Sequence, residues 1–307
     1  MIDYTVDTLV TDIKTTASVP AAQPRFDPAG IIKIMTRILQ SKIVPMIMSC
    51  QEEFFVAYQD YTIVQGNIIG YPIPKDAVGM KVRSVVLVNQ ASLTNLTALP
   101  RLSIEQISGY YFGQTVPFGF YIQNNNVILW PVNQTTPANT IRLYYLKRTN
   151  VLTSSQNCGQ VESIAGNILT LSNVPSTWAN GTILNAIDNE PGFNTIASNR
   201  EITNISGNDV TLDDVTDIEE DFWMALEGYS PIAQVPVELQ QLLVQGTALE
   251  ILKSLGNTEG YQKLEIEYKD LTKFCKDAMT PRSDGNPKKA ISAGNGLAEW
   301  CGFQWKS

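Results

Sequence analysis

The chain has 307 residues, which is enough for a sizeable core and for two or three structural modules. It contains no histidine, and this excludes Ser-His and Cys-His nucleophile pairs as well as most zinc and iron sites. Its net charge of −8 makes a basic, nucleic-acid-binding face unexpected. Charged residues make up 17% of the chain, below the usual level of about 25%, which suits both a protein buried in an assembly and an ordinary polar surface. We therefore expect a protein that is not an enzyme, with only carboxylate- or lysine-based chemistry left open.

Cysteine usage and the first residues indicate the compartment. Cys50, Cys158, Cys275 and Cys301 are far apart in the sequence and form no C-x-x-C pair, so we expect free thiols in a reducing environment. The N-terminus has no basic segment followed by an apolar run, and no apolar stretch approaches the roughly 20 residues that span a bilayer. These features predict a soluble protein made in a cytoplasm, without membrane contact.

The first 60 residues are predicted to be helical. Residues 5–16 carry apolar side chains at helical spacing, and a second helix begins with Asp27 as its cap and Pro28 in its first turn. Pro45 interrupts the second helix, and we expect a third helix over residues 46–58. The apolar positions of the first two helices are Val6, Leu9, Val10, Ile13, Ile31, Ile34, Met35, Ile38 and Leu39.

From Tyr61 the apolar period changes to two, which is typical of strands. Residues 62–74 predict a hairpin with its turn at Gly66-Asn67, and residues 123–126 predict the turn of another hairpin. Ser103 to Gln106 has the form of a capping box that opens a brief helix. Residues 61–150 are therefore expected to form one compact antiparallel β module. Its other strands are expected over residues 80–88, 118–122, 127–130 and 141–146.

An internal repeat follows. Residues 163–171 (SIAGNILTL) match residues 204–212 (NISGNDVTL), and a further candidate strand comes after each copy, at residues 181–184 and 223–226. A supersecondary unit that occurs twice predicts a small pseudo-symmetric β-barrel or sandwich, which we assign to residues 157–229.

The helical period then returns. Residues 236–256 and a last helix from Thr258 complete a discontinuous bundle built from residues 1–60 and 236–280, and Gly246 on the apolar face predicts close helix packing. The predicted fold is thus α+β: a discontinuous α-helical bundle with an antiparallel β module and an inserted small pseudo-symmetric β-barrel.

Residues 281–307 lose periodicity and are expected to form an extended C-terminal tail. Aromatic residues are unexpected in a solvated tail, so they are candidates for ordering on a partner, with folding back on the same domain as the alternative. A small basic cluster in the tail could contact a phosphate or an acidic partner surface. The six candidate partner-binding residues are Arg282, Lys288, Lys289, Trp300, Phe303 and Trp305.

Other charged groups carry no recognisable chemistry. The acidic run over residues 213–221 lacks the alternating ligands and the central glycine of a calcium loop, so it is interpreted as a solvated connection. Glu52 and Glu53 are adjacent on an expected helix and point apart. No phosphate-binding Gly-rich loop or nucleophile-elbow motif occurs in the chain. We expect no catalytic, cofactor-binding or metal-binding residues.

A set of segments stands out in order along the chain, at residues 43–48, 71–74, 117–122, 127–131, 143–148, 226–236, 254–256 and 281–289. Taken together, these segments resemble the head-to-tail connector (adaptor) proteins of tailed bacteriophages, particularly podovirus-like ones. The resemblance implies a ring, typically of twelve subunits, that docks under the portal protein, extends the DNA channel and offers a platform to tail or nozzle proteins. It also implies that DNA passes without specific binding, and that the protein resides at the head-tail junction of the virion after assembly in the bacterial cytoplasm.

Two other functions stay open. The predicted barrel could bind a host glycan in a tail or fibre-attachment protein, which exposed Trp or Tyr clusters on the barrel would favour. A carboxylate-based cell-wall hydrolase is the second alternative, although no pair of residues in the chain supports it.

Overall fold

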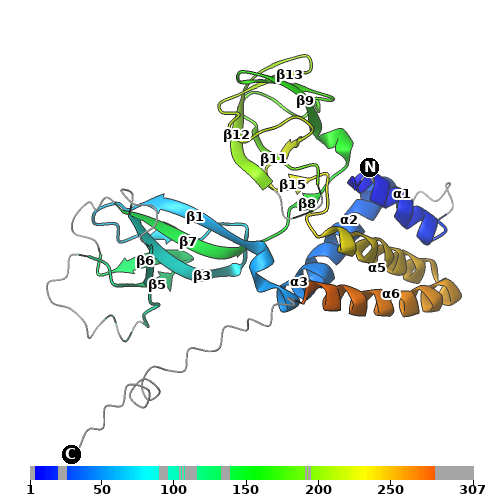
Figure 1. Cartoon of the computed structure of the whole chain (residues 1–307), viewed down its shortest axis with the longest axis horizontal. Coiled ribbons are helices and arrows are strands. Elements are labelled where there is room, and N and C mark those ends of the chain that lie inside the picture. The colour runs from blue at the N-terminus through cyan, green and yellow to red at the C-terminus, as the bar shows by residue number, and fades with distance from the viewer. Residues whose placement is uncertain are drawn as a thin grey trace, which may run out of the picture.

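The computed structural model describes residues 4–280 apart from 20–25, 90–95, 104, 106, 108–115, 133–138, 191 and 193–194. Helix and sheet each account for 35% of the protein, and six antiparallel strands close into a barrel. Figure 1 shows the helices grouped together, with a β module on one side and the barrel on another. The mixed helix-and-sheet composition and the inserted barrel that the sequence predicted are confirmed.

Helices from both ends of the chain share one hydrophobic cluster. Apolar residues at helical spacing, such as Ile31, Met35 and Leu249, are buried in it because each helix turns one face inward. At Gly246 a Cβ atom would meet Ile38 Cγ2 and Tyr268 Cε2, each at 3.2 Å, which confirms the predicted close packing. These helical elements are α1 (Val6–Thr16), α2 (Pro28–Ile38), the π-helical turn η2 (Leu39–Ile43), α3 (Val44–Cys50), the 3-10 turn η3 (Glu52–Phe55), α5 (Val237–Leu255) and α6 (Thr258–Met279).

The prediction of a third helix over residues 46–58 is wrong in its second half. Helix α3 ends at Cys50, Gln51 leaves the helical region at φ −141°, and strand β1 (Val56–Thr62) begins at Val56. Tertiary pairing with a distant strand overrides the local helical pattern there. Pro45 does not break the helix, because the π-helical turn η2 directly before it provides a wider turn, in which Val44 N–H donates to Leu39 O.

The compact antiparallel β module predicted for residues 61–150 consists of two sheets around one core. One sheet has the order β1-β7-β3-β4 and the other β2-β6-β5, and both contribute to the same buried cluster. The predicted hairpin over residues 62–74 is wrong, because β1 pairs with β7 and β2 pairs with β6. The remaining strands are β2 (Tyr71–Pro72), β3 (Ala77–Asn89), β4 (Leu96–Leu99), β5 (Gly119–Gln123), β6 (Asn126–Trp130) and β7 (Asn139–Lys147).

The hairpin predicted around residues 123–126 is confirmed. Strands β5 and β6 pair, and the turn residues Asn124 and Asn125 have φ of 49° and 59°. Asparagine tolerates this left-handed region better than most residues, which is why two of them can close a two-residue turn. The brief helix predicted from Ser103 lies partly outside the described residues.

The barrel confirms the predicted repeat. Its strand order is β10-β13-β12-β11-β14-β9, closed on itself, so the two matching segments form the hairpins β9–β10 and β12–β13. The chain enters through β8 (Val151–Leu152), then the 3-10 turn η4 (Ser155–Asn157), and leaves through β15 (Tyr229–Ser230), which pairs with β8 in parallel. The barrel strands are β9 (Gly159–Ala165), β10 (Ile168–Leu171), β11 (Ile183–Ile187), β12 (Thr195–Ser206), β13 (Asp209–Leu212) and β14 (Trp223–Leu226).

The two halves of the barrel are related by an approximate two-fold axis. Exchanging β9 with β12, β10 with β13 and β11 with β14 reproduces the same set of neighbouring strands. Matching hydrogen bonds follow the exchange: Gly181 N–H donates to Ile202 O, and Asp221 N–H donates to Val161 O, both at 2.8 Å. Each half therefore completes the other, and the barrel cannot close with one copy alone.

Candidate functional site

The six predicted partner-binding residues, in the tail that follows α6, lie outside the described residues. The structure therefore leaves Arg282, Lys288, Lys289, Trp300, Phe303 and Trp305 without a described position.

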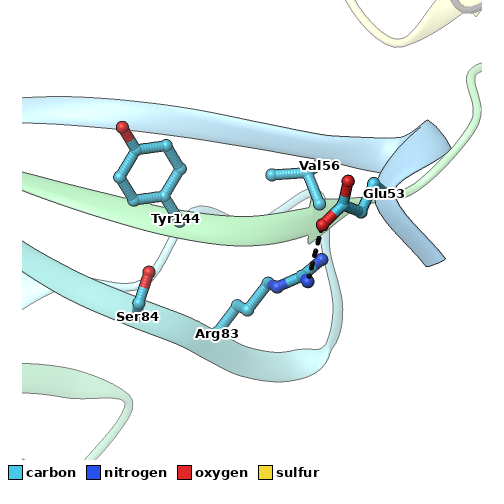
Figure 2. Close-up of a pocket in the computed structure, with 5 residues that line it drawn as sticks. All are labelled: Glu53, Val56, Arg83, Ser84 and Tyr144. Atoms are coloured by element: carbon cyan, nitrogen blue, oxygen red, sulfur yellow. Dashed lines mark hydrogen bonds and ion pairs between the residues drawn. The ribbon is translucent and has the colours of Figure 1, made fainter. Parts of the chain in front are cut away.

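The β module carries a cavity of about 400 Å³ on the outer face of its larger sheet. Figure 2 shows the side chains around it, which come from η3, β1, β3 and β7. Strands β1 and β3 both pair with β7, so their outward-facing residues gather beside Tyr144. We call this hollow the tyrosine cavity, and it is lined by Glu53, Val56, Arg83, Ser84 and Tyr144.

The charges at the tyrosine cavity are paired. Arg83 Nη2 lies 3.4 Å from Glu53 Oε1. The Glu53 side chain is 82% exposed, so solvent weakens this ion pair and it contributes little to stability. The pair instead places one positive and one negative group at the rim of the cavity.

A stronger ion pair lies farther along the same sheet face. Arg142 Nε and Nη2 donate to the two carboxylate oxygens of Asp60, both at 2.7 Å. The two residues are direct cross-strand partners on β1 and β7, which explains the bidentate geometry. The hydrogen bond to Asp60 is the main reason that the pKa of Arg142 is raised, so the guanidinium stays charged.

Two tyrosines connect this ion pair to the cavity. The Arg142 guanidinium carbon lies 4.0 Å from the centre of the Tyr58 ring, and the Tyr58 and Tyr144 rings are 6.0 Å apart. Tyr58 is 56% exposed. Tyrosine and arginine are among the residue types enriched where proteins recognise one another. The outer face of this sheet is therefore a candidate protein-binding surface.

This face does not assemble a nucleophilic site from its hydroxyl groups. Ser84 needs a neighbouring base for activation, and the chain has no histidine. Both arginines are held by carboxylates, so the arrangement is suited to recognition more than to proton transfer.

A second polar cluster surrounds Asp76 in the turn before β3. Tyr145 O–H donates to Asp76 Oδ2 at 3.3 Å, and burial, followed by the negative charge of Asp76, raises the pKa of Tyr145 and of Tyr61. Burial lowers the pKa of Lys147, while Asp76 and Glu227 act in the opposite direction. Because the Asp76 backbone oxygen also accepts from Arg148 N–H at 2.7 Å, we assign this cluster to anchoring the end of β7.

The acidic run is part of the barrel framework. Asp213 Oδ1 accepts from Glu201 N–H at 2.9 Å, and Asp214 pairs with Arg200. Hydrogen bonds from Thr216 are the main cause of the lowered pKa of Asp214. Within the part of the chain that the structure describes, no three Cys, Asp or Glu residues gather in a way that could hold a metal ion.

Both tryptophans of the barrel segment are buried, Trp178 in the core of the barrel and Trp223 in a separate cluster with Ile232. Trp178 is 6% exposed and Trp223 is 9% exposed. They pack in buried clusters, so these two rings are unavailable to stack on a sugar.

The sequence did not predict the outer face of the β1-β7-β3-β4 sheet as a candidate site. The pairs Tyr58-x-Asp60 and Arg142-x-Tyr144 alternate as strand residues do, but they become one surface only when β1 pairs with β7. That pairing joins segments more than 80 residues apart, and no local signal in the sequence predicts it.

No described helix has both the length and the apolar character needed to cross a membrane. Neither the comparison with protein-family models nor that with curated proteins finds a match for this chain.

Proposed function

We propose that this protein is a non-enzymatic structural subunit of a phage head-to-tail adaptor ring. In this role the ring docks under the portal protein, extends the DNA channel and offers a platform to tail or nozzle proteins. The proposal draws on the resemblance of the sequence, and one structural observation carries it furthest. Helices from both ends of the chain share a single core, while two β bodies project from it (Figure 1).

This architecture suits a ring subunit for a physical reason. The buried apolar cluster joins the first helices to the last two and fixes the helical body, so its outer helix faces can pack against neighbouring subunits. The β module and the barrel are then free to contact other proteins. In the proposed ring, typically of twelve copies, these helices form a bundle that surrounds the channel.

The charge balance is compatible with a channel that DNA passes through. A net charge of −8 repels the phosphate backbone, so the wall would not retain DNA. The proposed location is the head-tail junction of the virion, after assembly in the bacterial cytoplasm.

Native mass spectrometry tests the proposal directly. The full chain is measured alone and after mixing with the portal protein encoded in the same genome, with the portal alone as the control. We expect a portal-dependent complex whose added mass corresponds to a ring of 33.9 kDa subunits, twelve in the typical case. Absence of any portal-dependent ring would overturn the proposed function.

A further inference from the structure

One loop of the β module exposes large apolar side chains at its tip. Ile68 and Ile69 are 72% and 74% exposed, and Val64 is 57% exposed. No charged residue occurs anywhere in residues 61–74. Grouped apolar exposure of this kind marks an interaction surface more often than isolated exposed residues do. We call residues 64–70 the isoleucine loop.

The isoleucine loop is held in a fixed shape. Asn67 Oδ1 accepts from the N–H groups of Ile69 and Gly70 at 3.1 and 3.0 Å, and Asn67 Nδ2 donates to Gly70 O at 3.2 Å. Gly70 has φ +86°, and a Cβ atom there would lie 2.6 Å from Val127 O. The loop is thus anchored against β6. Because its shape is already fixed, little further conformational entropy is lost when its apolar tip binds a partner.

The tyrosine cavity is a suitable counterpart for this loop. Val56 and the Tyr144 ring provide apolar surface, and its volume of about 400 Å³ lies within the roughly 300–1,000 Å³ of ordinary ligand pockets. Arg83 is paired with Glu53, so an uncharged loop can cover the cavity without separating a charge from its partner. Charge repulsion between two acidic chains is also small where one of the two surfaces carries no charge.

The loop and the cavity lie at opposite ends of the same strand. The cavity includes Val56, where β1 begins, and the loop follows Thr62, where β1 ends. Seven extended residues separate them by about 20 Å, so the loop cannot fill the cavity of its own chain.

We propose that the isoleucine loop of one copy docks into the tyrosine cavity of a second copy of this chain. Because the two surfaces are different, the contact is heterologous, and its repetition produces a closed ring or an open filament. The inference goes beyond the proposed function, since this contact requires neither a portal protein nor any other phage component.

Disulfide trapping between copies tests the contact. In a background with Cys50→Ser and Cys301→Ser, chains carrying Ile69→Cys and chains carrying Ser84→Cys are purified separately, mixed and oxidised. We expect disulfide-linked dimers in the mixture and only background levels in either sample alone. Ile168→Cys, at an isoleucine that is 42% exposed on the barrel, is the matched control and should give no dimer with Ser84→Cys. Equal yields from both pairs would overturn the proposal.

Association in solution provides a second measurement that needs no engineered cysteine. The double substitution Ile68→Ser and Ile69→Ser should weaken self-association, followed by sedimentation velocity, at least about tenfold, which corresponds to the loss of one well-buried apolar contact. Ile168→Ser, at a 42% exposed position on the barrel strand β10, should leave self-association unchanged. A wild-type chain that stays monomeric at high concentration, or an unchanged double variant, contradicts the contact. If a portal-dependent ring still forms in that case, the contact fails while the proposed function stands.

Discussion

At the residue scale, burial decides the chemistry of the cysteines. Of the thiols that the structure describes, Cys50, Cys158 and Cys275 are all free, which confirms the expectation for these three positions. Cys158 is fully buried, and burial, together with the charge of Asp7, raises the pKa of its thiol to about 12. Burial also raises the pKa of Cys275. A thiol that stays protonated and shielded is a packing residue and not a nucleophile.

The reactivity of Cys158 follows from this pKa. At pH 8 roughly one part in ten thousand of a thiol with a pKa of about 12 is ionised, so iodoacetamide should not label Cys158 in the folded protein. Cys50, which is half-buried on α3, should be labelled under the same conditions, and both should react in urea. Peptide mapping by mass spectrometry measures this. Labelling of Cys158 at the rate of Cys50 in the native state would contradict it.

The same shift has a consequence for stability. The folded-state pKa lies above the unfolded value of about 9, so the ionisation of this thiol does not affect stability below pH 9 and destabilises the folded chain as the pH rises from 9 toward 12. In the neutral range the thiol is protonated in both the folded and the unfolded chain, so its titration leaves stability unchanged there.

At the element scale, the two halves of the barrel act as controls for one another. Gly181 has φ +84° and Asp221 has φ +69° at equivalent turns, although only glycine adopts this region without strain. A Cβ atom at Gly181 would find its nearest neighbour, Glu201 Oε1, at 3.9 Å, so only the backbone conformation opposes a side chain there.

This equivalence predicts stability changes of opposite sign. Gly181→Ala should destabilise the protein by about 1–2 kcal/mol, the usual penalty for a left-handed residue with a Cβ atom. Asp221→Gly should stabilise it by up to about 1 kcal/mol, since relief of strain exceeds the entropy that glycine adds to the unfolded chain. Urea denaturation of the two variants beside wild type measures both effects. Equal effects, or effects in the same direction, would show that the two turns are not equivalent.

Elements whose partners are close in the sequence were predictable, and elements with distant partners were not. The turn at Asn124-Asn125 joins adjacent strands, so turn chemistry alone identifies the β5–β6 hairpin. Val56 to Tyr58 carry a pattern that suits either a helix or a strand, and only pairing with β7 selects the strand. The face formed by Arg142 and Tyr58 depends on that pairing, which is why it was absent from the sequence-based prediction.

At the scale of the whole molecule, the barrel is attached through a narrow connection. Strands β8 and β15 are paired, so the chain enters and leaves the barrel at neighbouring points. Ser154 and Ser155 contact the Asp7 carboxylate, and Ile232 packs against Trp223 in a small buried cluster. The barrel has its own, larger core, to which both of its halves contribute.

Residues 157–229 should therefore fold alone. A closed barrel has no exposed strand edges, and the separate core provides the burial needed for cooperative unfolding. We expect a β-type circular dichroism spectrum and a cooperative thermal transition, at a lower temperature than in the full chain because contact with Ile232 is lost. The matched control is residues 157–206, which lack β13 and β14; this fragment cannot close the barrel and should remain unfolded. An unfolded longer fragment would show that the barrel needs the rest of the chain in order to fold. A folded shorter fragment would show that the barrel does not depend on mutual completion of its two halves.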